Sequence, residues 1–134
     1  MIAFFDTSVY LDLFAGNLTA AYLSEIFGRY IIRISPIVLH ELYRGTRTKK
    51  DRRTVDRLAS GLLRVQPPSW EEAWIRAGRL LPYLFPDHEA VGLARLQNDL
   101  LLALTAHSQG AVFISRDKHF QDIQHILPFY CELV

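Results

Sequence analysis

The sequence contains a single cysteine, Cys131, which excludes an intramolecular disulfide and a cysteine-rich zinc site. It also lacks any apolar run near the ~20 residues that a membrane-spanning helix needs. The richest apolar stretch covers only residues 100–106, and the first residues, MIAFFD, lack the basic start of a secretory signal. We therefore expect no membrane partner and, by default, a cytoplasmic protein.

An excess of charge of one sign is also missing, because 15 Lys and Arg oppose 14 Asp and Glu, for a net charge of +1. No global positive field attracts nucleic acid, so any such affinity must come from local patches. Half of the residues are hydrophobic and 22% are charged, which excludes a disordered chain. A length of 134 residues predicts one domain spanning residues 1–134.

Segments typical of strands alternate with segments typical of helices. We expect strands at residues 2–5, 30–34, 111–114 and 129–134, with a weaker candidate at 63–66. Helices are predicted after Asp6, over 18–28, from Ser35-Pro36 to about Gly45, over 51–63, from Trp70 towards Tyr83, in the stretch ending at Gly110, and briefly after Asp117. This alternation predicts an α/β fold of three layers (α/β/α) around a short, mostly parallel central sheet.

Two acidic residues follow predicted buried strands. Asp6 comes directly after the first strand, and Asp117 comes just after the strand at residues 111–114. Ligands of open parallel sheets bind beyond the carboxyl ends of the strands, so the two carboxylates share a crevice if these strands are neighbours. Taken alone, each residue is better explained as a helix cap or turn former, which is the usual role of an aspartate between a strand and a helix.

Two further acids fall on apolar helix faces. Glu41 projects from the stripe formed by Ile37, Val38 and Leu42, where an unpaired carboxylate is costly. Asp99 precedes the apolar stretch 100–106, and we expect it at the N-terminal end of a buried helix, where the helix dipole favours negative charge. For Glu41 the alternatives are a salt bridge or a stripe that is merely semi-exposed, and for Asp99 a simple helix cap. Asp12 lies opposite the apolar stripe of its helix and is expected to be solvated.

Four acids in one crevice would raise one another's pKa strongly unless a cation lay among them. Ligation by oxygen alone favours Mg²⁺ or Mn²⁺ over zinc. Such sites hydrolyse phosphodiesters with one or two metal ions.

These residues, in this order, resemble the PIN domain family over nearly the whole chain. The resemblance rests on FDTSV at residues 5–9, VLHELYRG at 38–45, NDLLLA at 98–103 and FISRDKHF at 113–120. In the family the fourth motif usually reads Thr-x-Asp-x-x-Phe, so Ser115 stands where threonine is commoner. The stretch 80–97 is a second departure, because it has an extra proline-rich loop around residues 85–87; a loop is expected at residues 86–88.

The resemblance implies a metal-dependent endoribonuclease of the VapC toxin type, with a cognate antitoxin protein as partner and a homodimer as its assembly. Asp6, Glu41, Asp99 and Asp117 would be the catalytic acids that bind Mg²⁺ (or Mn²⁺), and Ser8 and Ser115 would support them by hydrogen bonds. Two alternatives stay open: an RNA-processing PIN nuclease without an antitoxin, and a catalytically silent PIN-fold interaction module.

Basic residues concentrate just after the Glu41 helix, where residues 44–57 contain seven basic and two acidic side chains. The functional interpretation is contact with RNA phosphates, and the alternative is a solvated helix face. The predicted RNA-binding residues are Arg44, Arg47, Lys49, Lys50 and Arg116. Apolar side chains on the early helices (Tyr10, Phe14, Tyr22, Phe27) could form a partner groove or simply pack in the core.

Overall fold

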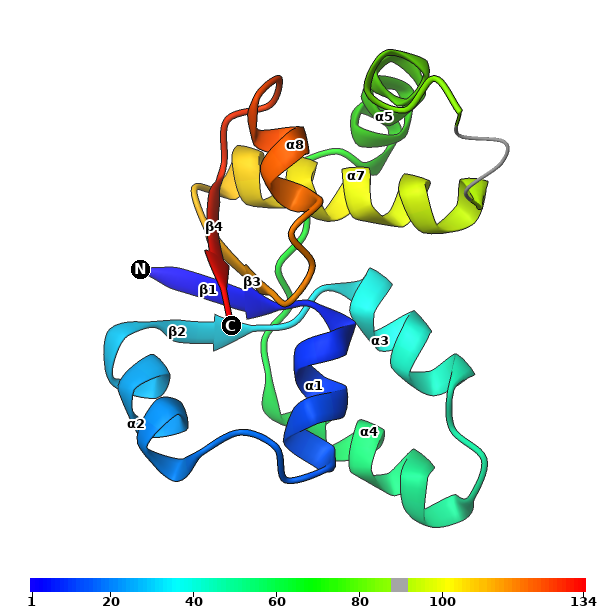
Figure 1. Ribbon diagram of the computed structural model, residues 1–134. Coiled ribbons are helices and arrows are strands. Elements are labelled where there is room, and N and C mark those ends of the chain that lie inside the picture. The colour runs from blue at the N-terminus through cyan, green and yellow to red at the C-terminus, as the bar shows by residue number, and fades with distance from the viewer. Residues whose placement is uncertain (88–91) are drawn as a thin grey trace.

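The computed structural model describes residues 1–87 and 92–134, which surround a four-stranded sheet in the order β2-β1-β3-β4 (Figure 1). The strands are β1 (Ile2–Phe5), β2 (Ile31–Arg33), β3 (Val112–Ser115) and β4 (Tyr130–Leu133). All three strand pairs are parallel, and Ala3 of β1 lies opposite Ile32 on one side and Val112 on the other. The short parallel sheet is therefore confirmed.

Helices cover both faces of this sheet. The helices of the described residues are α1 (Thr7–Phe14), α2 (Ala20–Arg29), α3 (Pro36–Arg44), α4 (Lys49–Gly61), α5 (Trp70–Leu84), α7 (Leu93–Gln109) and α8 (Phe120–Gln124). Figure 1 shows α1 to α4 on one side of the sheet and α5, α7 and α8 on the other. The predicted three-layer α/β/α arrangement is confirmed. None of the helices in these ranges combines the length and apolarity required to cross a bilayer.

The core forms where β1 and β3 meet the two helix layers. Phe4 and Phe113 are fully buried side by side, with ring centroids 5.0 Å apart. Every residue of α7 from Leu100 to Ala106 is buried, as the apolar run predicts. This packing fixes the strand ends and the middle of α7 relative to each other.

Side-chain caps set most helix starts at the expected places. Asp6, Ser35 and Ser69 each accept a backbone N–H at the start of α1, α3 and α5. The predicted start at residue 51 was wrong: α4 begins at Lys49, because the side chain of Thr48 accepts from Asp51 N at 3.1 Å.

The predicted strand at residues 63–66 was also wrong. This segment makes only an isolated bridge between Arg64 and Ile34, with Val65 N donating to Ile34 O at 3.0 Å. Pro67 and Pro68 follow, and because proline has no N–H it cannot extend the ladder. The predicted loop after α5 is described at Pro86 and Asp87, while its His88 lies outside the described residues.

The strand order places a switch point next to β1. The chain passes from β1 to β2 on one side and later returns to β3 on the other side. In open parallel sheets, the crevice at such a point is the preferred ligand site. The residues that follow β1 and β3 are Asp6 and the loop that carries Asp117.

Candidate active site

A cleft of about 680 Å³ opens at the carboxyl ends of β1 and β3. All four predicted acids line it, although they come from four separate parts of the chain. The lining residues are Asp6, Ser8, Glu41, Arg44, Ala94, Arg95, Asn98, Asp99, Arg116, Asp117 and Lys118. The acids predicted from strand ends and from helix faces therefore line the same cleft.

Asp6 is held rigidly at the floor of this cleft. Its Oδ1 accepts the Thr7 N–H at 2.8 Å, which caps α1, and its Oδ2 accepts from Ser115 Oγ at 2.8 Å. Burial raises the pKa of Asp6, and the charges of Asp99 and Asp117 raise it further, against the lowering effect of the hydrogen bonds. The cap interpretation is thus confirmed for Asp6, which also lines the cleft.

Two serines hydrogen-bond to Asp6, as the family resemblance implied. Ser115 is fully buried; it donates to Asp6 and accepts from Asp117 N at 3.0 Å, so that it joins the ends of β1 and β3. Ser8 Oγ lies at the longer distance of 3.5 Å from Asp6 Oδ2. Ser115 therefore makes the stronger connection between the acids.

Glu41 reaches the cleft from α3, whose Val38 and Leu42 are buried. Its Oε1 accepts from Thr7 Oγ1 at 3.0 Å, so α1 orients both Asp6 and Glu41. Burial raises the pKa of Glu41, and the charges of Asp6 and Asp99 act in the same direction. No positive side chain within 4.0 Å pairs with Glu41 among the described residues, so the salt-bridge alternative is wrong there.

We predict that Glu41→Gln stabilises the metal-free protein at neutral pH. A raised carboxyl pKa means that the native state holds its proton more tightly than the unfolded state. Protonated Glu41 therefore contributes its full stabilisation at a pH below the pKa that it has in the unfolded chain. This stabilisation is lost as the pH rises through the pKa that Glu41 has in the folded protein. In thermal unfolding with a chelator, Glu41→Gln should melt above the parent at pH 7, and this difference should vanish near pH 4.

Glu71→Gln is the matched control. Glu71 lies exposed in the first turn of α5, where its charge favours the helix, so its replacement should lower the melting temperature slightly. Equal melting temperatures of Glu41→Gln and the parent across this pH range would contradict the prediction that the charged Glu41 carboxylate destabilises the folded protein.

Asp99 is more deeply placed than the sequence suggested. It is the seventh residue of α7, which begins at Leu93, so the expected position at the N-terminal end of the helix was wrong. Its side chain lies 2.8 Å from His119, measured from Oδ2 to Nε2, and this contact raises the pKa of His119 against the effect of burial. A histidine, rather than the helix dipole, faces this carboxylate.

Asp117 is paired with an arginine. Arg95 Nη2 lies 2.8 Å from Asp117 Oδ2, and the His119 N–H donates to Asp117 Oδ1 at 3.0 Å. Burial alone would raise the pKa of Asp117, but the N–H and the positive charges of His119 and Arg95 outweigh it and lower the pKa. Asp117 is thus the acid of the cleft whose charge is best compensated.

The donor set fits a hard divalent cation that keeps part of its water shell. The acids offer only oxygen atoms, and the pKa values of Asp6 and Glu41 are raised first by burial and then by neighbouring carboxylate charges, which a cation would offset. Within residues 1–87 and 92–134, no group of three or more His, Cys, Asp or Glu side chains is placed so that it could hold a metal ion. Mg²⁺ commonly binds through only one or two carboxylates and keeps several waters, so it needs no such group.

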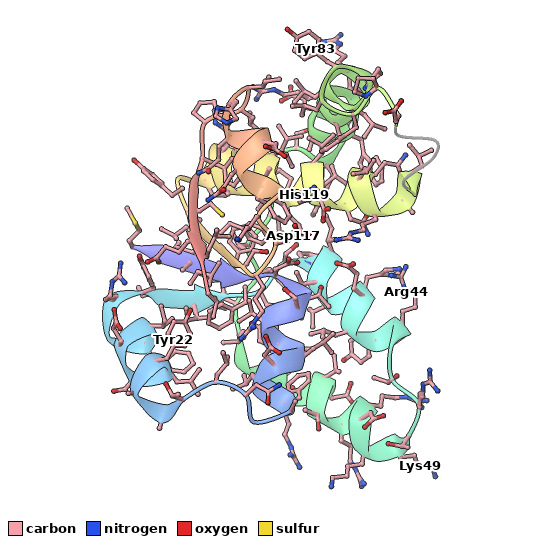
Figure 2. All side chains as sticks on the ribbon, viewed as in Figure 1. Tyr22, Arg44, Lys49, Tyr83, Asp117 and His119 are labelled. Atoms are coloured by element: carbon pink, nitrogen blue, oxygen red, sulfur yellow. The ribbon has the colours of Figure 1, made fainter. Side chains whose placement is uncertain are left out.

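Of the predicted RNA-binding residues, the structure brings only Arg44 and Arg116 to the cleft. Figure 2 shows Lys49 far from Asp117, at the outer end of α4, and Arg47 and Lys50 likewise do not line the cleft. Arg116 forms an ion pair with Asp12, so the expectation that Asp12 is solvated was wrong.

The apolar residues of the early helices divide into two groups. Tyr10 belongs to the core, with 1% of its surface exposed. Phe14 and Phe27 are 41% and 55% exposed, and Tyr22 is half-buried against the core. The two exposed phenylalanines are the ones that remain open to a partner.

Sequence reasoning missed Arg95, Asn98 and His119, which line or support the cleft, and the contact of the Thr7 hydroxyl with Glu41. Asn98 and His119 lie inside the quoted motifs but had no assigned part. Arg95 is one helical turn before Asp99, and this i, i+4 spacing places both on one face of α7. That spacing was the available signal for Arg95.

Comparisons with known proteins agree with this geometry. The family model described as "PIN domain" matches residues 3–126. Among solved structures, VapBC2 from Rickettsia felis bound to a DNA fragment from their promoter is similar with a TM-score of 0.70 and 21% identity, covering 100% of this chain and 99% of that chain. VapBC-1 from nontypeable Haemophilus influenzae gives a TM-score of 0.72 and 22% identity, covering 99% and 98%.

No curated protein matches this sequence. The family match nevertheless spans most of the chain, and the four acids of its motifs meet in one cleft at the switch point of the sheet. The chain therefore belongs to the PIN domain family.

Proposed function

We propose that this protein is an Mg²⁺- or Mn²⁺-dependent endoribonuclease that acts on RNA in the cytoplasm. The observation that carries the proposal is the meeting of Asp6, Glu41, Asp99 and Asp117 in one cleft. These residues come from the end of β1, from α3, from α7 and from the loop after β3, and no simple packing requirement brings four acids together.

Asp6, Glu41, Asp99 and Asp117 would hold the cation. When bound, a divalent ion lowers the pKa of water and stabilises the charge that develops on phosphate oxygens. Ser115 and Thr7 orient Asp6 and Glu41 by their hydroxyl groups. One acid of the cleft would accept a proton from the attacking water, and burial raises the pKa values of both Asp6 and Glu41.

The rim of the cleft would bind the phosphate backbone. Arg44, Arg95, Arg116 and Lys118 line it, and all four are exposed at the surface. Arg95 is 71% exposed although it contacts Asp117, so its guanidinium is accessible to a phosphate. Such contacts release counterions, and binding should weaken as salt increases.

We predict opposite effects of Arg95→Gln on the two ligands. Because the guanidinium competes for Asp117 Oδ2, its removal should strengthen Mn²⁺ binding in calorimetric titration. Because a phosphate contact is lost, RNA affinity should fall, and the slope of log K against log salt should decrease by about 0.7 for a single strand.

Arg47→Gln is the control for this prediction, since Arg47 is exposed but lies outside the cleft. It should leave Mn²⁺ binding unchanged. If Arg95→Gln and Arg47→Gln behaved alike in both titrations, Arg95 would neither compete with the cation for Asp117 nor contact a phosphate.

We further propose that the protein is the toxin of a type II toxin–antitoxin pair and forms a homodimer. Support comes from the two similar structures, which are VapBC proteins, one of them bound to promoter DNA. The exposed Phe14, together with Leu11 at 56% exposure, gives α1 an apolar surface suited to a protein partner.

Cleavage of total cellular RNA by the purified protein tests the proposal. Discrete fragments that require Mg²⁺ or Mn²⁺ and disappear with EDTA are expected. Cleavage without growth arrest on expression would favour the RNA-processing alternative. Failure to cleave, together with failure to bind either metal, would overturn the nuclease and leave the interaction module.

A further inference from the structure

His119 contacts two of the four acids of the cleft. Its Nε2 lies 2.8 Å from Asp99 Oδ2 and 3.9 Å from Asp117 Oδ2, while its backbone N–H donates to Asp117 Oδ1 at 3.0 Å. In Figure 2 the labelled His119 and Asp117 lie beside each other, in agreement with the 3.9 Å contact. One residue thus joins the acid of α7 to the acid that follows β3.

The contact with Asp99 is made by buried atoms. Asp99 Oδ2 and His119 Nε2 are both shielded from solvent, and neither has a hydrogen-bond partner within the described parts of the chain, so Asp99 Oδ2 is met by this ion-pair contact at 2.8 Å. Asp99 nevertheless lines the cleft. With Oδ2 turned towards His119, Oδ1 is the oxygen that Asp99 can present to a ligand, so the histidine determines which way the carboxylate faces.

Two aromatic rings restrain the imidazole. Phe85 stacks on it, with centroids 5.8 Å apart and ring planes at 26°, and Phe120 meets it edge-on at 4.8 Å and 79°. Phe120 is fully buried and packs against Phe113 of the core, so the ring that meets the histidine edge-on is itself held in place. Phe85, the C-cap residue of α5, covers the imidazole face on which it stacks.

We propose that His119 is a positioning residue that fixes the Asp99 carboxylate, and that Phe85 acts through His119 by holding its ring in place. The inference rests on the proposed function, in which Asp99 is a cation ligand. Carboxylates that bind metals are themselves hydrogen-bonded by neighbouring groups, and loss of such a group typically costs 10–100-fold in affinity. The end of α5 therefore contributes to the site without touching it.

The test is calorimetric titration of Mn²⁺ into the full chain, which needs no RNA. His119→Ala should weaken Mn²⁺ binding about 10–100-fold. His119→Gln should restore most of the affinity, because its amide nitrogen can occupy the place of Nε2. Phe85→Leu should also weaken binding, but it should add nothing in a His119→Ala background, since both changes act on one contact.

Matched controls are His125→Ala and Phe27→Leu, which replace an exposed histidine and an exposed phenylalanine away from the cleft. Both should bind Mn²⁺ like the parent. Thermal unfolding of every variant separates loss of the fold from loss of the ligand. If His119→Ala does not fold, His119→Gln and Phe85→Leu still decide the matter.

The outcomes distinguish the two proposals. A parent protein that binds no Mn²⁺ overturns the proposed function and this inference with it. If the parent binds Mn²⁺ and Asp99→Asn does not, but folded His119→Ala binds as tightly as the parent or more tightly, the proposed function stands and the positioning role is wrong. If the losses of Mn²⁺ affinity caused by Phe85→Leu and His119→Ala add up in the double variant, Phe85 does not act through His119.

Discussion

Asp6→Asn is expected to abolish RNA cleavage while leaving the protein folded. A bound cation contributes several kcal/mol of charge stabilisation, and each ~1.4 kcal/mol corresponds to a tenfold rate, so the loss should be about 100-fold or more. The fold should survive because the asparagine carbonyl can still cap α1 and the Ser115 hydroxyl can turn to accept from the new amide. The measurement is the initial rate of RNA cleavage in Mn²⁺.

Asp122→Asn is the matched control for this prediction. Asp122 is an exposed aspartate in the first turn of α8 and does not line the cleft. It should cleave RNA at the parent rate. Retention of full activity by Asp6→Asn, with its fold intact, would remove Asp6 from the catalytic centre.

Ser115→Ala is expected to lower both stability and activity. The fully buried hydroxyl donates to Asp6 Oδ2 and accepts from Asp117 N, and its removal leaves both groups without that partner. A buried polar group that loses its partner costs about 1–3 kcal/mol, so the free energy of unfolding in urea should fall by that amount. Because Asp6 loses the group that orients it, cleavage should fall by about 10–100-fold.

Ser60→Ala provides the comparison, since Ser60 is exposed on α4 and its hydroxyl bonds only its own helix backbone at Asp56 O. Its effect should stay within about 0.5 kcal/mol. Equal free energies of unfolding for Ser115→Ala and Ser60→Ala would contradict the bridging role of Ser115.

Local sequence patterns were sufficient to predict the four strands of the sheet and three of the acids that line the cleft, but not the order of the strands. The apolar runs before Asp6 and Asp117 identify buried strands, and the rule for parallel sheets places ligands at their carboxyl ends. Glu41 was predictable because it interrupts an apolar stripe with helical spacing. These three residues follow from patterns that extend over a few neighbouring positions.

The partners of the acids were not predictable in this way. Arg95 pairs with Asp117, which is 22 residues away in the sequence. Phe85 stacks on His119, which joins the end of α5 to the loop after β3, and no sequence pattern relates these two segments. The pairing of Arg116 with Asp12 likewise depends on how α1 sits beside the loop after β3. Such contacts are fixed by tertiary packing, and hydrophobic periodicity does not encode them.

Anomalous diffraction from crystals soaked in Mn²⁺ tests the central claim most directly. The account predicts an anomalous peak in the cleft within coordination distance of at least one of Asp6, Glu41, Asp99 and Asp117, and its loss in Asp6→Asn crystals. Crystals of the parent that show no peak in the cleft at saturating Mn²⁺, or a peak only elsewhere on the surface, would contradict it.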